Sequence, residues 1–195
     1  MRAIDRRAML FGAFAAAGAP LVLGAAAQGA GEHPAVARMR NVVADLLATQ
    51  RSGTPAAYYK MITRHADLPA IALYALGPYR PELKRSQQRE FFRGVGMFIA
   101  RYFADQARRY QVAKAEISPA VRADAEDVLV HSTVTLASGS SYTVVWRLAV
   151  VGKGYKIRDV SVLGFSLRYL NRSLFQSFIA RRGGGFQALY AALTQ

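Results

Sequence analysis

The chain has 195 residues and a mass of 21.3 kDa, and 26 Lys and Arg against 12 Asp and Glu give it a formal net charge of +14. It contains no cysteine, which excludes disulfide scaffolds, cysteine-ligated zinc, iron–sulfur clusters and thiol catalysis. With 52% hydrophobic and 19% charged residues, the composition is that of a globular protein and excludes disorder as the main state. The length suits one domain with a sizeable core.

The beginning of the chain has the composition of an export signal. Three arginines lie within the first seven residues, Ala8–Leu23 is an uncharged stretch of sixteen residues, and Ala25–Ala27 offers the small residues of a cleavage site. The uncharged stretch is shorter than the ~20 strongly apolar residues of a membrane-spanning helix. We therefore predict a signal peptide over 1–27 and a periplasmic protein. Arg6-Arg7 resembles the core of a twin-arginine signal, so twin-arginine and general export both stay open, and an uncleaved anchor is the alternative.

Export changes which binding partner the net positive charge predicts. Removing 1–27 takes away three arginines and Asp5, which leaves 23 basic against 11 acidic residues. Nucleic acid is not an expected partner outside the cytoplasm, whereas anionic membrane surfaces are the polyanions available there. The charge therefore predicts transient contact with a membrane surface, and a solvated basic face that only adds solubility is the alternative.

The N-terminal half is predicted to be helical. After a polar linker over 28–34, apolar residues at helical spacing predict a helix over Ala35–Gln50. Thr54-Pro55 is a helix start, which opens a second helix through Ile62, and a short third helix covers Ala70–Leu76.

The longest periodic segment is Lys84–Tyr110, which we predict to be one amphipathic helix. Gly94 and Gly96 interrupt it, and each costs about 1 kcal/mol relative to Ala in a helix, so they indicate close packing or open space at that level. Its apolar face is aromatic and steps by three and four along the chain: Phe91, Val95, Phe98, Ile99, Tyr102 and Phe103.

After Tyr110 the hydrophobic period changes from 3.6 to 2, which predicts strands and then closing helices. We predict an α+β fold in which the N-terminal helices pack on one face of a curved antiparallel sheet of about four strands, and C-terminal helices close an apolar cavity. This single domain covers 35–195. The predicted strands are Val112–Ile117, Asp127–Leu136, Tyr142–Val151 and Tyr155–Leu163, and the predicted helices are Ser166–Ala180 and Phe186–Leu193.

Catalytic and metal-binding patterns are sparse. The three histidines, His33, His65 and His131, lie far apart without ligand spacing, and the chain has neither a Gly-x-Ser-x-Gly elbow nor a phosphate loop. We therefore expect no metal and no cofactor. Asp159 lies mid-strand, where it is either a general base facing a cavity or a structural carboxylate that caps a helix or pairs with an arginine such as Arg158 or Arg172.

Three segments carry a resemblance to a known family. The run Tyr155–Phe175 is similar to the hallmark stretch of the toluene-tolerance family, the MlaC-like periplasmic lipid-binding proteins of Gram-negative bacteria. Ser86–Phe92 resembles the start of that family's long helix. Gly183–Leu193 resembles the pattern that ends the family's sequences. The chain departs from the family pattern at Leu163, where a glutamate is usual, and at Tyr155 and Phe165, where Trp and a smaller residue are usual.

The resemblance implies a non-enzymatic shuttle. It would carry phospholipid or a related apolar lipid between membrane complexes, as the soluble component of an Mla-type ABC transport system. Its partners would be an inner-membrane MCE-domain/ABC transporter complex and an outer-membrane complex, and a hopanoid-associated member is a variant. The alternatives are a non-catalytic envelope interaction protein with a basic membrane-docking face, and a small exported enzyme that uses Asp159 as a base.

A lipid carrier must cover some thirty methylenes, each worth about 0.8 kcal/mol, so we expect a cavity near the upper end of the ~300–1,000 Å³ range. Large apolar side chains with few rotamers suit its walls, although each one alone also suits an ordinary core. The predicted helix wall is Phe92, Val95, Phe98, Ile99 and Tyr102, the sheet wall is Val144, Trp146, Leu148, Val160 and Val162, and the mouth is Tyr74 and Phe165. Unspecified arginines at the rim would pair with the phosphate.

Overall fold

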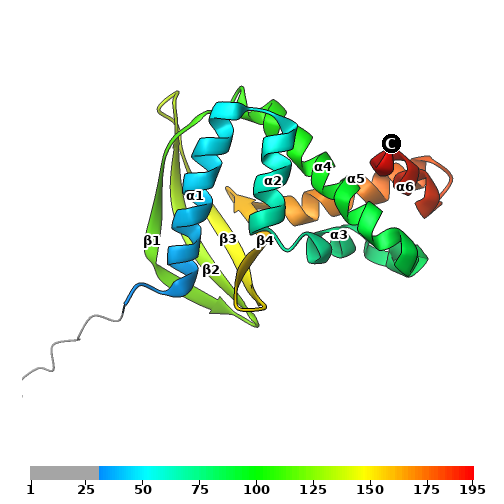
Figure 1. Cartoon of the computed structure of the whole chain (residues 1–195), viewed down its shortest axis with the longest axis horizontal. Coiled ribbons are helices and arrows are strands. Elements are labelled where there is room, and N and C mark those ends of the chain that lie inside the picture. Colours follow the sequence, from blue (N-terminus) through cyan, green and yellow to red (C-terminus); the bar gives the residue numbers. More distant parts are fainter. Residues whose placement is uncertain (1–30) are drawn as a thin grey trace, which may run out of the picture. The chain divides into compact units, whose positions relative to one another are not determined.

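The structure is a computed structural model that describes residues 31–195 (Figure 1). The predicted signal peptide over 1–27 and the first three residues of the predicted linker over 28–34 lie outside the described residues. Helix α1 (Pro34–Ser52) begins where His33 Nδ1 accepts a 3.1 Å hydrogen bond from the amide of Ala35. It ends at Gly53, whose φ of 63° closes the helix with a bond to Thr49.

The next two helices each start with a side-chain cap, of which the sequence analysis predicts the one at Thr54. Helix α2 (Pro55–His65) is capped by Thr54 and helix α3 (Leu68–Leu76) by Asp67, and each has a proline in its first turn. The long helix predicted over Lys84–Tyr110 is shorter in the structure, because its first residues form a 3₁₀ turn and it ends at Ala107. Two short 3₁₀ turns, η1 (Gly77–Glu82) and η2 (Arg85–Gln87), precede helix α4 (Gln88–Ala107).

The two glycines of α4 are sites of close packing. A Cβ on Gly94 would collide with the backbone of Leu193 in helix α6 (Phe186–Thr194), and one on Gly96 would lie 2.8 Å from Leu68 and 2.9 Å from Tyr59. Of the two interpretations of these glycines, the structure selects close contact between helices.

The predicted α+β class is confirmed, and the sheet has five antiparallel strands in the order β1-β2-β3-β4-β5. The fifth strand has two residues, too few to produce a period in the sequence. Strand β1 is longer than predicted because it continues past Pro119 at the sheet edge, where residues 118–120 oppose only His131. The strands are β1 (Val112–Asp124), β2 (Asp127–Leu136), β3 (Ser141–Val151), β4 (Gly154–Val162) and β5 (Phe165–Ser166).

The apolar interior consists of two clusters. In the sheet cluster, α1 lies across one face of the sheet (Figure 1) and contributes Val36 and Met39 to an apolar core that also contains Trp146 and Leu148. The helical cluster lies among α2, α3, α4, α6 and helix α5 (Leu167–Arg181), beside the sheet rather than on it. The helices therefore do not all cover one sheet face. Only α1 does so broadly, and the others meet the sheet mainly along β4.

Candidate functional site

A largely apolar cavity of about 150 Å³ lies where the two clusters meet. Its walls come from α1, α2 and α4 on one side and from β3, β4 and α5 on the other. The apolar side chains are Val42, Leu46, Met61, Ile62, Ile71, Phe98, Ile99, Tyr102, Phe103, Trp146, Ile157, Val160, Leu167, Leu170 and Leu174. His65, Arg158, Asp159, Arg168 and Asn171 also border the cavity, but its accessible surface is almost entirely apolar, which suits hydrocarbon.

The cavity is smaller than the sequence led us to expect. A cavity of about 150 Å³ suits a benzene-sized molecule, and drug-sized ligands occupy about 300–1,000 Å³. The volume is small because large side chains extend from both clusters, including Phe98 from α4 and Trp146 from β3. Phe98 is held against Phe175 of α5, with ring centroids 5.6 Å apart.

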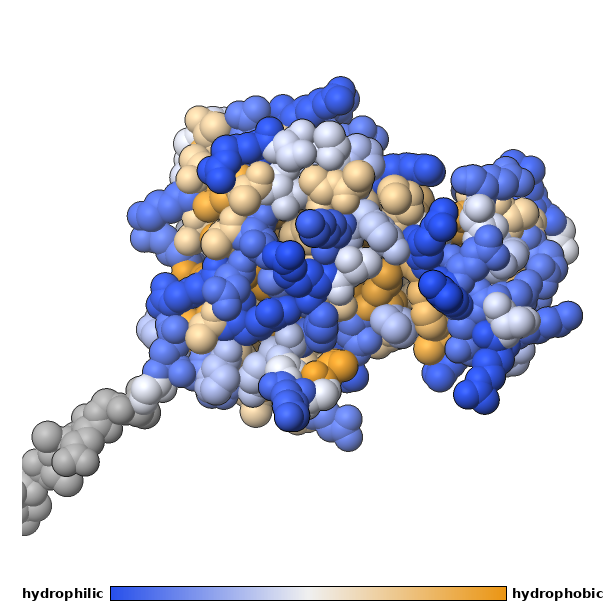
Figure 2. Space-filling model, in the orientation of Figure 1, coloured by the Kyte–Doolittle hydropathy of each residue, from blue (hydrophilic) through white to orange (hydrophobic). Residues whose placement is uncertain are grey.

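The cavity opens between α4 and α5. Tyr102, Leu170 and Leu174 line it, and yet 44–45% of each side chain is exposed to solvent. Figure 2 shows a mostly hydrophilic surface, with hydrophobic side chains visible in the recess between the part that holds the sheet and the part that holds α6. Exposed apolar side chains at an opening are typical of a binding site rather than of a closed core.

A wider groove of about 730 Å³ lies next to this opening. Its floor is the other face of the sheet, with Val145 and Arg147, and its wall is the start of α5. Leu167, Arg168 and Leu170 border both the groove and the apolar cavity. The first turn of α5 therefore separates the apolar cavity from the open, more polar groove.

The carboxylate of Asp159 accepts hydrogen bonds at this junction from one side chain and two backbone amides. The donors are Ser166 Oγ at 2.6 Å and the amides of Arg168 at 3.0 Å and Val160 at 2.8 Å. The side chain is buried, and these bonds join β4 to the start of α5. This arrangement is the structural, helix-capping one of the two interpretations of Asp159.

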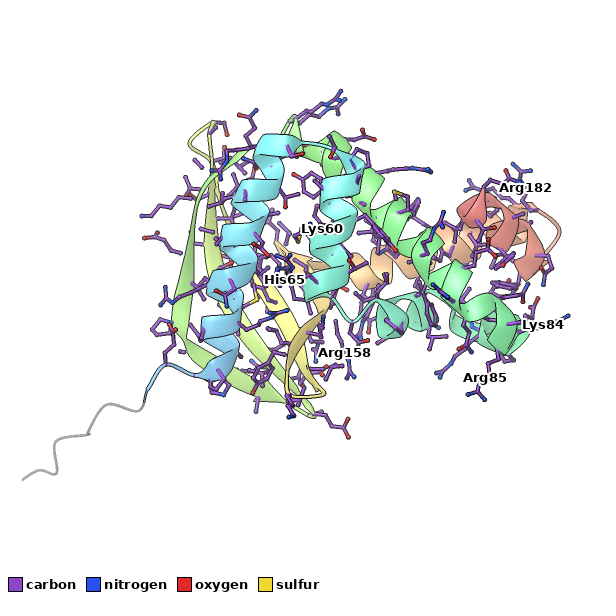
Figure 3. The ribbon with its side chains drawn as sticks, viewed as in Figure 1. Lys60, His65, Lys84, Arg85, Arg158 and Arg182 are labelled. Atoms are coloured by element: carbon purple, nitrogen blue, oxygen red, sulfur yellow. The ribbon has the colours of Figure 1, made fainter. Side chains whose placement is uncertain are left out.

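His65 is the most buried polar side chain of the cavity wall, with 2% of it exposed (Figure 3). Its Nε2 lies 2.7 Å from Asp45 Oδ2, and its Nδ1 is buried without a hydrogen-bond partner among residues 31–195. Burial lowers the pKa of His65, and the hydrogen bonds from His65 and then Arg64 lower the pKa of Asp45. The ring is thus neutral, with Nε2–H donating to the Asp45 carboxylate.

Within residues 31–195 no three His, Asp or Glu side chains gather as metal ligands do. The same residues include no helix that is long and apolar enough to cross a membrane.

The profile of the MlaC protein family matches residues 39–195. The chain belongs to the MlaC family. The family resemblance predicted from Tyr155–Phe175 is thereby confirmed. No curated protein matches this chain.

A solved structure shares the MlaC-family fold. It is a phospholipid-binding protein from Ralstonia solanacearum, determined in complex with a phospholipid. It superposes with a TM-score of 0.66 at 24% sequence identity, over 83% of this chain and 95% of that one.

The residues predicted to contact lipid in this MlaC-family chain fall into three groups. Those that line the cavity are Phe98, Ile99, Tyr102, Trp146 and Val160. Those that lie in or against the two apolar clusters are Phe92, Val95, Val144, Leu148 and Val162. The remaining two lie on the α5 side: Tyr74 packs on Tyr169, and Phe165 is exposed at the rim of the groove.

The grouping has a geometric cause. The first half of α4 packs on α6, where the ring centroids of Phe91 and Phe186 lie 5.7 Å apart, and Phe92 and Val95 belong to this half and to the helical cluster rather than to the cavity lining. Only its second half reaches the junction with the sheet.

The sequence analysis did not predict that residues of α5 line the cavity. Leu167, Leu170 and Leu174 step by three and four residues, which is the signal that identifies one face of a helix. The α1 residues Val42 and Leu46 have the same spacing of four. The spacing identifies each set as one face of a helix, but it does not show that the two faces line one shared cavity.

Proposed function

We propose that this protein is a periplasmic, non-enzymatic carrier that holds phospholipid or a related apolar lipid. It shuttles the lipid between membrane complexes as the soluble component of an Mla-type ABC transport system. Membership of the MlaC family supports this proposal, as does the phospholipid bound to the structural neighbour from Ralstonia solanacearum. The observation that carries it is the apolar cavity with an open, apolar mouth between α4 and α5.

The cavity is able to enlarge because its walls belong to two different clusters. Val42, Trp146 and Ile157 belong to the sheet side, whereas Ile62, Phe98 and Phe103 belong to the helical side. Sliding the two sides apart leaves each cluster packed, so the cost is lower than that of opening a cavity inside either one. The incoming chains offset that cost, since each buried methylene contributes about 0.8 kcal/mol.

A carrier of this kind must also reach a bilayer, and the β4–β5 turn is suited to that contact. Phe165 is 79% exposed, and Leu163 and Tyr169 beside it are exposed as well. Arg168 and Arg172 follow this turn in the first half of α5, and the chain has no acidic residue after Asp159. Exposed apolar side chains next to positive charge bind anionic lipid surfaces, so this turn is the proposed site of transient docking.

Native purification followed by lipid mass spectrometry tests the carrier function. We expect phospholipid to co-purify at a stoichiometric level and a stripped sample to regain it from vesicles. A protein that emerges without lipid and takes up none would instead be an envelope interaction protein, the alternative raised by its basic surface.

Shuttling is tested by mixing donor vesicles that contain a fluorescent phospholipid with unlabelled acceptor vesicles. The protein should accelerate transfer in proportion to its concentration. Transfer at the spontaneous rate would contradict the carrier mechanism.

A further inference from the structure

Two arginines near the start of α5 converge on one tyrosine of α3, and the first of them, Arg168, borders the apolar cavity. The guanidinium carbon of Arg168 lies 4.1 Å from the ring centroid of Tyr74, and that of Arg172 lies 5.2 Å from the same ring. Tyr169 packs edge-on against Tyr74, with ring centroids 5.5 Å apart. Tyr74 thus makes cation–π contact with both guanidinium groups, and Tyr169 adds one with Arg168 at 5.8 Å.

Neither arginine has a carboxylate partner within residues 31–195. The arginines that form salt bridges there are Arg40, Arg64, Arg147 and Arg158, which lie on α1, α2 and the sheet. Arg158, for example, contacts both Asp67 and Asp127. The acid nearest in sequence to Arg168 is Asp159, and its oxygens are already bonded to Ser166 and to backbone amides.

Arg168 also keeps an unsatisfied donor. Its Nε is buried and has no hydrogen-bond partner in the described part of the chain, and the side chain as a whole is half-buried. A buried, charged donor without an acceptor is destabilising, and a second guanidinium nearby adds repulsion. An anion between Arg168 and Arg172 would relieve both costs.

Gly77 makes room for this arrangement. A Cβ at that position would lie 3.1 Å from Arg172 Nε, and the φ of 55° is one that other residues rarely adopt. The end of α3 is thereby able to approach α5 closely enough for Tyr74 to meet both arginines.

The location identifies the ligand class. Arg168 borders the hydrocarbon-lined cavity on one side and the open groove on the other, which is where the polar end of an amphiphile with buried tails would lie. Guanidinium forks bind phosphate oxygens in pairs. Resting on the proposed lipid-carrier function, we infer that Arg168 and Arg172, positioned by Tyr74, form a phosphate site for the lipid headgroup.

The test compares ligands with and without phosphate. Protein stripped of lipid is titrated with monomeric dihexanoylphosphatidylglycerol, with dihexanoylglycerol and with inorganic phosphate. Trp146 is the single tryptophan and lines the cavity, so its fluorescence reports occupancy, and calorimetry measures affinity independently.

The double variant Arg168→Gln/Arg172→Gln should bind the phospholipid about 10- to 100-fold more weakly and the diacylglycerol unchanged. The matched control Arg181→Gln/Arg182→Gln removes the same charge from the far end of α5, and Figure 3 places Arg182 beside α6, away from the sheet. It should leave both affinities unchanged.

Equal phospholipid affinity in the two double variants would overturn the proposed site. An equal loss of affinity for the phospholipid and the diacylglycerol in the Arg168/Arg172 variant would also overturn it, because that result indicates a packing role. If the wild-type protein binds neither lipid, the carrier function itself fails. Inorganic phosphate that then binds the wild type, but not the first double variant, would mark a free-phosphate site and overturn the headgroup assignment.

Discussion

The indole Nε1 of Trp146 donates a 2.8 Å hydrogen bond to Ser132 Oγ on the neighbouring strand, and both side chains are buried. Trp146 belongs to the sheet cluster and also lines the cavity. The bond therefore holds a large cavity-wall side chain in one orientation while satisfying its only polar atom.

Replacing Ser132 with alanine should destabilise the fold. The variant leaves the indole N–H buried without a partner, which costs about 1–3 kcal/mol. Urea unfolding checks this, and the Trp146 emission should change in the folded protein. Thr143→Ala, at an exposed position of β3, should stay within about 0.5 kcal/mol of wild type. Equal stability of the two variants would show that the bond contributes nothing.

A charge placed on the α4 wall should abolish lipid loading. Phe98→Asp puts a carboxylate into the apolar lining, whereas Arg108→Ala changes an exposed residue at the end of the same helix. Lipid mass spectrometry of the purified variants is the measurement. Leu174→Asp provides a second variant, since its half-exposed position at the mouth tolerates charge without unfolding. Wild-type lipid content in both aspartate variants would remove this surface from the site.

The stability of the protein should fall as the pH drops through the range below 6.5. Burial lowers the pKa of His65 from its usual 6.5, so the unfolded chain takes up a proton that the folded ring resists. The stabilisation is complete above pH 6.5 and is lost as the pH falls toward the folded pKa. Asp45, with its lowered pKa, acts in the same direction below 3.8.

His65→Gln isolates the histidine contribution, because glutamine keeps a donor for Asp45 and does not titrate. Urea midpoints at pH 7.5 and 5.5 should converge in the variant and differ in the wild type. A wild-type midpoint that does not change between these pH values would contradict the assignment.

Removing the exposed ring of the β4–β5 turn should weaken membrane docking. Burying a phenylalanine contributes about 1.5–3 kcal/mol, so Phe165→Ser should bind phosphatidylglycerol vesicles roughly 10- to 100-fold more weakly. Val150→Ser is the matched control, since Val150 is 61% exposed on the β3–β4 hairpin. Sedimentation with vesicles at low and high salt separates the electrostatic contribution to binding, which salt screens, from the hydrophobic contribution. Identical binding of the two variants would place the docking surface elsewhere.

Local patterns were sufficient to predict most of the elements. The caps at Thr54 and the spacing of apolar residues in α4 depend only on neighbours along the chain, so the helices and four main strands were predicted within a few residues. The exceptions are also local. The second half of β1 was not predicted because it follows Pro119, and proline is unusual within a strand. Strand β5 is too short to show a period.

The sequence by itself determined the element order, the α+β class and the family, because periodicity and motif order are properties of the chain. Only the tertiary structure decided which apolar residues face a cavity, since Val95 and Phe98 share a helix pattern but meet different neighbours. It also decided which charges are paired. Within residues 31–195 the Arg158 side chain contacts two carboxylates from distant segments, whereas the Arg168 guanidinium contacts aromatic rings and no carboxylate, and no spacing along the chain distinguishes the two.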